Sequence, residues 1–341
     1  MTTHSRVLAA ALLLGTALPA SADVLLPEGD AGSVLRLSDD LSVLGRIEGL
    51  PAVHGLAAAP ARGLLIAGSL VESDEGIDRP AGVSMDDHDA HHGDGPMGAD
   101  AGMKATTSPL SLVDAATGEI VHRIAVPGMV HHVAVDDDER YAVATHPGLG
   151  SASLIDLETR ELVATIATGP NPNYAVADPS NDRFVVSNAG NGTLSVIDPK
   201  RAFVERNIKI DGAGEHMVLR EGRAIVARAE DGHVSIVDVA SGETLSTHDI
   251  GGRLHGVEVD SDGTVFVSAR ERGRIVRLDP ETGKRTESSP GPQPSHMTMT
   301  DRDLLVSSAA EPVVWIVDLD TLAVTNTIET AAVAHQMVVA D

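Results

Sequence analysis

The chain has 341 residues, a formal net charge of −25, an aromatic content of only 2% and no cysteine. Without cysteine, disulfides and thiolate metal sites are excluded, so a bound metal must take His, Asp, Glu or Met as ligands. The scarcity of aromatic rings and the negative charge exclude nucleic acid and anionic membranes as main partners. The charge suits a protein that attracts cations, or it simply serves solubility.

Residues 1–22 have the pattern of a secretory signal peptide. Arg6 gives a positive start, residues 7–18 form an apolar core, and Ala20-Ser21-Ala22 fits a small-x-small cleavage site. No later apolar run approaches membrane-spanning length, and a lipoprotein anchor would need a cysteine. We expect residues 23–341 to be exported in soluble form and, in a bacterium with an outer membrane, to reside in the periplasm.

The two ends of the mature chain complement each other. Residues 24–28 and 33–48 read as the outer strands of a unit that lacks its own inner strand. The last apolar strand, residues 335–339, reads as one inner strand with no partners following it. Pairing of these two ends is expected because it closes a ring and covers an exposed sheet edge.

A short sequence motif, in which a histidine opens an apolar strand, recurs along the chain. From His131 onward the copies lie 43, 42, 39, 41 and 39 residues apart, and the next copy has Tyr174 in place of histidine. An aspartate that ends an apolar strand recurs from Asp114 to Asp318 at intervals of 42, 42, 40, 41 and 39 residues. A period of about 40 residues with several short strands per repeat indicates a β-propeller. We predict an all-β, seven-bladed β-propeller whose C-terminal inner strand closes the first blade.

An insertion interrupts this period between His54 and His131, which lie 77 residues apart. The excess is about 35 residues beyond one repeat. Residues 72–106 have no periodicity and are rich in Gly, Asp and His, so we expect a mobile loop. The cluster favours metal binding, and the alternative is a solvated acidic loop. The candidate ligands in it are His88, His91, His92 and Asp89.

Six inner strands open with a histidine, and these residues are expected near one mouth of the central channel: His54, His131, His216, His255, His296 and His335. Three or four imidazoles there can converge on one ion in the tetrahedral N/O coordination that zinc prefers. The alternative is that each histidine bonds channel water or a backbone carbonyl. Tyr174 is expected as a supporting donor, His132 as a packing residue on the other strand face, and Glu215 as a carboxylate partner.

Common catalytic motifs are absent from the sequence, which has no Gly-x-Ser-x-Gly elbow, phosphate-cradling glycine loop or His-Glu-x-x-His helix. We therefore expect no catalytic residues and a protein that is not an enzyme. Three alternatives stay open. One is a metal-dependent hydrolase or lactonase that acts in the channel. Another is a copper-binding chaperone, for which Met85, Met97 and Met103 supply thioethers. The third is a scaffold that binds another protein without metal.

Two strand motifs are typical of the repeats, Leu194-Ser195-Val196-Ile197-Asp198 and Arg183-Phe184-Val185-Val186-Ser187-Asn188. Over nearly the whole mature chain the repeats resemble YVTN-type β-propellers. With the export signal, the His/Asp loop and the inner-strand histidines, the chain looks more narrowly like the AztD-type periplasmic zinc metallochaperones. That resemblance implies a protein that binds Zn²⁺ and passes it to the solute-binding protein of a zinc ABC transporter. We expect the protein to be a monomer. The individual ligands are assigned from the repeats and not from the resemblance.

Overall fold

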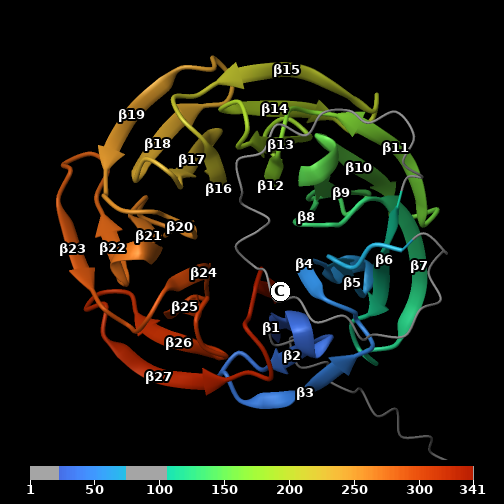
Figure 1. Ribbon diagram of the computed structural model, residues 1–341, viewed down its shortest axis with the longest axis horizontal. Coiled ribbons are helices and arrows are strands. Elements are labelled where there is room, and N and C mark those ends of the chain that lie inside the picture. The colour runs from blue at the N-terminus through green and yellow to red at the C-terminus, as the bar shows by residue number, and fades with distance from the viewer. Residues whose placement is uncertain (1–22, 74–105, 341) are drawn as a thin grey trace, which may run out of the picture.

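The computed structural model describes residues 23–73 and 106–340. Over these residues the chain forms seven four-stranded antiparallel sheets, arranged as blades around a central axis (Figure 1). The predicted fold, an all-β propeller with seven blades, is confirmed. The expected signal peptide, residues 1–22, and nearly all of the expected loop, including His88, His91, His92 and Asp89, lie outside the described residues. None of the described helices is long and apolar enough to cross a membrane.

Blades are numbered in chain order, and in blades 2–7 the strand nearest the axis comes first. Blade 1 holds β28 (Val338–Ala340), β1 (Asp23–Glu28), β2 (Ser33–Leu37) and β3 (Val43–Glu48). Blade 2 holds β4 (Val53–Ala59), β5 (Leu64–Ser69), β6 (Thr107–Asp114) and β7 (Ile120–Pro127). Blade 3 holds β8 (Val133–Val135), β9 (Tyr141–His146), β10 (Ser151–Asp156) and β11 (Glu161–Ala167). Blade 4 holds β12 (Pro172–Asp178), β13 (Arg183–Asn188), β14 (Thr193–Asp198) and β15 (Phe203–Lys209).

Blade 5 holds β16 (Gly214–Arg220), β17 (Arg223–Arg228), β18 (His233–Asp238) and β19 (Thr244–Asp249). Blade 6 holds β20 (Val257–Val259), β21 (Val265–Ala269), β22 (Arg274–Leu278) and β23 (Arg285–Ser288). Blade 7 holds β24 (Pro294–Met299), β25 (Asp303–Ser308), β26 (Val313–Asp318) and β27 (Val324–Glu329). Single 3₁₀ turns connect some strands, at η1 (Gly29–Ala31), η2 (Pro60–Arg62), η4 (Pro147–Leu149) and η5 (Arg270–Arg272).

The core lies between the faces of adjacent blades. Ile225 and Val234 of blade 5, for example, share one apolar cluster with Val257, Val265 and Val276 of blade 6. Middle strands such as β10 are buried along their whole length, whereas the outer strands alternate between covered and exposed residues. Because each blade is packed on both faces, the inner strands are fixed in place around the axis, and so are the side chains that open them.

The repeating aspartates are turn residues. Each carboxylate accepts the backbone N–H three residues later, at 2.6–3.2 Å, and so fixes the turn that leads to the outer strand. The six aspartates are Asp114, Asp156, Asp198, Asp238, Asp279 and Asp318. The second period of the sequence therefore reflects turn geometry, and these carboxylates are satisfied within their own turns.

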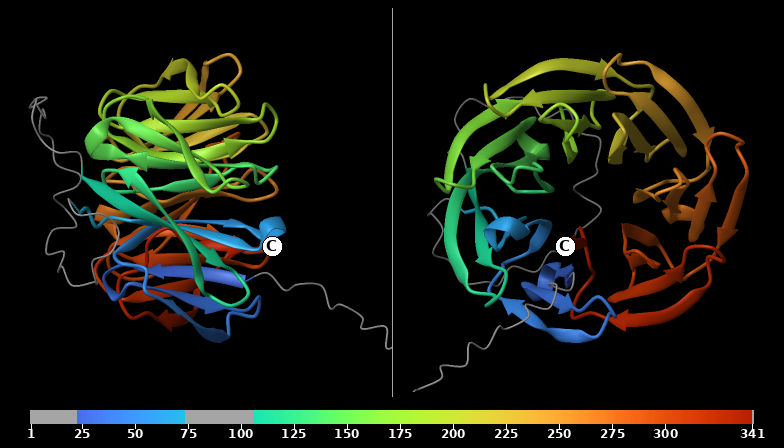
Figure 2. Two further views of the ribbon diagram at one scale, coloured as in Figure 1. Left: turned by 90° about the vertical axis from the view of Figure 1, so that its right-hand side faces the viewer. Right: turned by 180° about the vertical axis from the view of Figure 1, so that it is seen from behind.

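The ring is closed by β28, which pairs antiparallel with β1 through Leu25↔Val338 and Val24↔Val339. In both Figure 1 and Figure 2 the red C-terminal segment runs beside the blue strands of blade 1. Glu28, fully buried, also joins the two ends of the chain. Its carboxylate accepts hydrogen bonds from Ser33 Oγ at 2.6 Å, Arg46 Nε at 2.8 Å and the Ala331 backbone N–H at 2.7 Å.

Candidate metal centre

Each inner strand begins with a two-residue irregularity at one mouth of the channel. In blade 2, Val53 pairs with Ser69 and Leu56 with Ala67, so His54 and Gly55 together stand opposite one residue. The register shifts at the same place in β12, β16 and β24. In blades 1, 3 and 6 the N–H groups of His335, His131 and His255 bond the equivalent carbonyls of the neighbouring strand. Every blade thus presents two successive residues here.

The first of these two positions holds His54, His131, Asn173, Glu215, His255, Ser295 and His335, and the second holds Gly55, His132, Tyr174, His216, Gly256, His296 and Gln336. The expectation that all six ring histidines are equivalent is therefore corrected. Four occupy the first position, whereas His216 and His296 occupy the second, beside Tyr174. Because the bulge brings both positions to the channel, the six imidazoles still lie close together although two of them are shifted by one residue.

Glycine at the second position lets neighbouring inner strands approach closely. A Cβ on Gly55 would lie 3.0 Å from the backbone of His132, and a Cβ on Gly256 would lie 2.5 Å from the carbonyl oxygen of Ser295. A side chain cannot be accommodated at either place without moving the next blade. In these two blades the histidine therefore stands at the first position, at His54 and His255.

Hydrogen bonds between blades orient the imidazoles. His54 Nδ1 lies 2.7 Å from the carbonyl oxygen of His131, and His131 Nδ1 lies 3.0 Å from that of Asn173. Because a carbonyl only accepts, both rings carry their proton on Nδ1 and keep the lone pair on Nε2. Metal-binding histidines in proteins are held in this way by a bond from the second ring nitrogen.

Two groups of three buried histidines have the spacing of a metal site. His54, His296 and His335 form one group, and His216, His255 and His296 form the other, with ligand nitrogens all within 4.8 Å of one another. His255 Nε2 and His296 Nε2 lie 3.3 Å apart. Two zinc–nitrogen bonds of about 2.0–2.1 Å at a tetrahedral angle separate their nitrogens by roughly 3.3–3.4 Å. The residues present therefore fit zinc.

Burial favours the neutral form of three imidazoles at this mouth. Burial, followed by the charges of neighbouring histidines, lowers the pKa of His54 and of His132 well below 6.5. Burial lowers the pKa of His216 to about 3. A neutral imidazole is the form that binds a metal, so at neutral pH no proton has to be displaced from these rings.

Several polar atoms at the same mouth are buried with no hydrogen-bond partner within the described part of the chain. They are Asn173 Oδ1, Glu215 Oε2 and His132 Nε2. Neither ring nitrogen of His216 makes a well-formed hydrogen bond there, although the nearby His255 backbone raises its pKa slightly. Such groups are rare in folded proteins unless an ion or ordered water satisfies them. Their concentration at one mouth favours a polar or ionic occupant.

Other sequence expectations can be located directly. The ring of His132 stacks on Tyr174 with centroids 3.4 Å apart, and its Nδ1 accepts the N–H of Ala175 at 3.3 Å, which fits a packing role. Glu215 lies at the first position, where burial raises its pKa to about 7. Sequence reasoning missed Glu258, which lies three residues beyond His255, although it is the only ionisable residue at its position in the seven inner strands.

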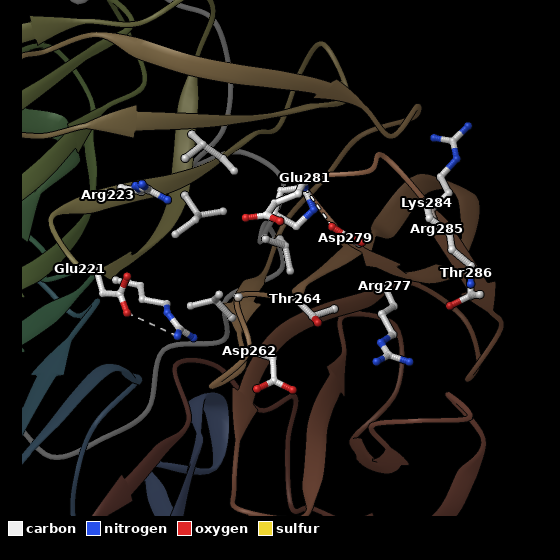
Figure 3. Close-up of a pocket in the computed structure, with 17 residues that line it drawn as sticks. Glu221, Arg223, Asp262, Thr264, Arg277, Asp279, Glu281, Lys284, Arg285 and Thr286 are labelled. Atoms are coloured by element: carbon white, nitrogen blue, oxygen red, sulfur yellow. Dashed lines mark hydrogen bonds and ion pairs between the residues drawn. The ribbon is translucent and has the colours of Figure 1, made fainter.

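A separate groove of about 580 Å³ lies between blades 5 and 6 at the opposite end of the inner strands (Figure 3). Ile225, Ile236, Val259 and Val265 line it, together with turn residues such as Asp262. Figure 3 shows charged side chains from both blades spread around the groove without a common focus. No histidine lines it. The groove is therefore not part of the candidate metal centre.

The structure defines a β-propeller with a histidine-lined channel mouth. A family model described as outer membrane protein assembly factor BamB, of the PQQ-type repeats, matches residues 87–285 and 230–331. The chain belongs to this propeller family. No curated protein has a sequence that matches it significantly.

Solved propeller structures cover nearly the whole chain. A putative 6-phosphogluconolactonase from Bacteroides fragilis superposes with a TM-score of 0.72 at 13% identity, over 96% of this chain and 99% of that one. A periplasmic gluconolactonase from Pseudomonas aeruginosa has a TM-score of 0.66 at 16% identity, over 94% and 99%. Dihydro-heme d1 dehydrogenase NirN has a TM-score of 0.65 at 15% identity, over 92% of this chain and 66% of its own.

These similarities correct one expectation. The prediction that the protein is not an enzyme is contradicted, because structures with this fold along their whole length are named as lactonases. The absence of a linear catalytic motif does not exclude an active site in this fold, because a propeller assembles its channel from residues of separate repeats. Identities of 13% and 16% show a shared fold.

Proposed function

We propose that the protein is a metal-dependent hydrolase that opens lactones at the histidine-lined mouth of its channel. The observation that carries the proposal is the buried group His216, His255 and His296, with a 3.3 Å separation between two of its Nε2 atoms. Three imidazoles leave one position of a tetrahedral site for substrate, as in catalytic zinc sites. The names of the two lactonase structures support the same reaction class.

Each part of the mouth has a role in this proposal. The three imidazoles hold Zn²⁺, which when bound supplies a Lewis acid for a carbonyl oxygen. The Nδ1–H groups of His54 and His131 donate to backbone carbonyls and so fix the ring planes around the mouth. The buried walls limit access of bulk water, which strengthens electrostatic interactions with the substrate. The export signal predicted at residues 1–22 and the similarity to a periplasmic gluconolactonase support a periplasmic location.

The test is lactone hydrolysis by untagged protein, followed as acid release at constant pH. Zinc-loaded wild type is expected to hydrolyse δ-valerolactone or gluconolactone, and chelator treatment is expected to abolish this activity reversibly. The variant His216→Ala/His255→Ala is expected to be inactive, whereas His122→Ala, which changes an exposed histidine on β7, serves as the matched control. Activity that survives in the double variant contradicts the proposal.

Zinc transfer to a periplasmic solute-binding protein is a second candidate, and a specific observation favours it. The two groups of three histidines share His296, so the mouth contains more ligands than one tetrahedral ion uses. An ion can then move by exchange of one ligand at a time. Ser69, just before the His/Asp-rich insertion, pairs with Val53 beside His54, so the insertion starts on the same face. Met85, Met97 and Met103 keep copper as an alternative metal.

A further inference from the structure

A small pocket lies beside the candidate metal centre, where blades 1, 2 and 7 meet. Its volume is about 100 Å³, well above the roughly 10–15 Å³ that one water molecule needs. Five of the residues that line it have apolar side chains: Ala52, Val53, Leu70, Ala309 and Val333. The pocket therefore has room for an apolar group larger than a water molecule.

His335 belongs both to this pocket and to the cluster of histidines. It lines the pocket, and its ring stacks on that of His54 with centroids 4.3 Å apart. A Cβ on Gly29, another lining residue, would lie 2.7 Å from His335 Nε2, so the glycine leaves room for this edge of the imidazole. The His335 ring centroid lies 5.8 Å from that of His296, a ligand of the proposed zinc site. A group bound in the pocket is therefore adjacent to a substrate held at the metal.

The pocket and the histidines lie at the same end of the inner strands. Val53 directly precedes His54 at the start of β4. Ala309 directly follows β25, and the last residue of β25 pairs with the first residue of β24, two positions before His296. A substrate that enters the channel mouth can thus reach the histidines and the pocket together.

The charges around the pocket disfavour an anionic occupant. Asp30, which is exposed, lines it, and none of the described lining residues is a lysine or arginine. The formal net charge of the chain is −25. A phosphate or carboxylate substituent would be repelled here without a cation to bind it, so the chemistry of the pocket suits an uncharged alkyl group.

We propose that this pocket binds an alkyl substituent of the substrate, and that the substrates are neutral lactones with a short alkyl chain. This inference rests on the proposed hydrolase function. An alkyl chain gains free energy when it leaves water for an apolar pocket. The hydroxyl groups of a sugar lactone would lose hydrogen bonds to water in the same place. The pocket therefore selects alkyl lactones over sugar lactones.

The experiment measures kcat/KM of the zinc-loaded protein for a series of lactones. The series is δ-valerolactone, which has no substituent, δ-hexalactone with a methyl group, δ-octalactone with a propyl group, and gluconolactone. Each methylene buried in the pocket is expected to raise kcat/KM about fourfold. The value for δ-octalactone is expected to exceed that for δ-valerolactone at least about tenfold, and to exceed that for gluconolactone.

A pair of matched variants tests the assignment to this pocket. Ala309→Leu fills the pocket from blade 7 and is expected to abolish the preference for δ-octalactone over δ-valerolactone. The control Ala189→Leu makes the same change at the equivalent position of blade 4, where the Ala189 N–H donates to Asn171 as the Ala309 N–H donates to Gln293. The control is expected to keep the preference. Because the preference compares two substrates of one sample, it does not depend on the fraction of folded protein.

The outcomes separate the pocket from the hydrolase function. Equal kcat/KM for the three alkyl-series lactones, a preference for gluconolactone, or a δ-octalactone preference that survives in Ala309→Leu overturns the role of the pocket alone. The same loss of preference in Ala189→Leu also overturns it. Wild-type protein that hydrolyses none of the four lactones overturns the hydrolase function as well.

Discussion

The Nε2 atoms of His255 and His296 face each other at 3.3 Å, although the two residues come from different blades and lie 41 positions apart in the sequence. Both side chains are buried, and His216 completes the group with its ring centroid 4.0 Å from that of His255 and 5.0 Å from that of His296. Two imidazole nitrogens at this separation are bridged well by one ion or one proton. This relationship is the basis of the predictions about metal binding.

Replacement of His216 and His255 by alanine is expected to weaken zinc binding by at least ~100-fold, because only one nitrogen of the group remains. Competition with a chromogenic chelator measures the affinity. The control His122→Ala, at an exposed position, is expected to bind zinc like wild type. Unchanged affinity in the double variant contradicts a site at these residues and favours histidines that bond only water and carbonyls.

Closure of the ring is expected to depend on Glu28. Replacement by alanine removes the buried acceptor of Arg46 and of the Ala331 N–H, and loss of a hydrogen bond to a buried charged group costs roughly 1.5–3 kcal/mol. Urea unfolding of Glu28→Ala measures the free energy of unfolding, with the exposed Glu48→Ala as control. If Glu28→Ala and the control unfold at the same urea concentration, this carboxylate does not stabilise the contact between the two chain ends.

Stability is expected to fall as the pH decreases below about 6.5. The pKa of His216 is about 3 and that of His146 about 4 in the folded protein, both lowered first by burial, against 6.5 ordinarily. Between these values the unfolded chain binds protons that the folded chain does not, so acid favours unfolding. Chemical denaturation at pH 7.5 and pH 5 is expected to differ by at least ~2 kcal/mol. The stability difference between the two pH values is expected to be smaller in His216→Gln than in wild type. In the control His122→Gln it is expected to equal that of wild type.

Residues 85–94 are expected to act in zinc transfer if the second candidate function holds. Deletion of this His/Asp-rich segment is predicted to leave zinc at the channel mouth but to slow its passage to an apo solute-binding protein. The measurement compares the rate of transfer with the rate of passive dissociation into a chelator. Transfer at the dissociation rate in both wild type and deletion argues against direct delivery.

The sequence was sufficient to predict the fold because each blade repeats two local signals. The turn aspartates, such as Asp156 and Asp238, stabilise the turn that leads to the outer strand. The histidine motif marks the start of the inner strands. The N-terminal strands lack an inner strand, and the C-terminal inner strand lacks outer strands. This predicted the pairing that is seen between β1 and β28.

The site was harder to predict, because its details depend on contacts between blades. The one-residue offset between His255 and His296 arises within the bulge, where either of two successive residues reaches the channel. The orientation of His54 depends on a carbonyl 77 positions away. The raised pKa of Glu258 is a result of burial. Alignment of the repeats would have revealed Glu258 as the only charged residue at its position in the inner strands, but not its environment.

Diffraction from zinc-soaked crystals at the zinc absorption edge tests the central claim most directly. The account predicts one anomalous peak at the channel mouth, about 2.0–2.1 Å from nitrogens of His216, His255 and His296. It also predicts that this peak disappears in crystals of His216→Ala/His255→Ala. A peak elsewhere on the protein with this group unoccupied, or no peak in crystals soaked at saturating zinc, would contradict it.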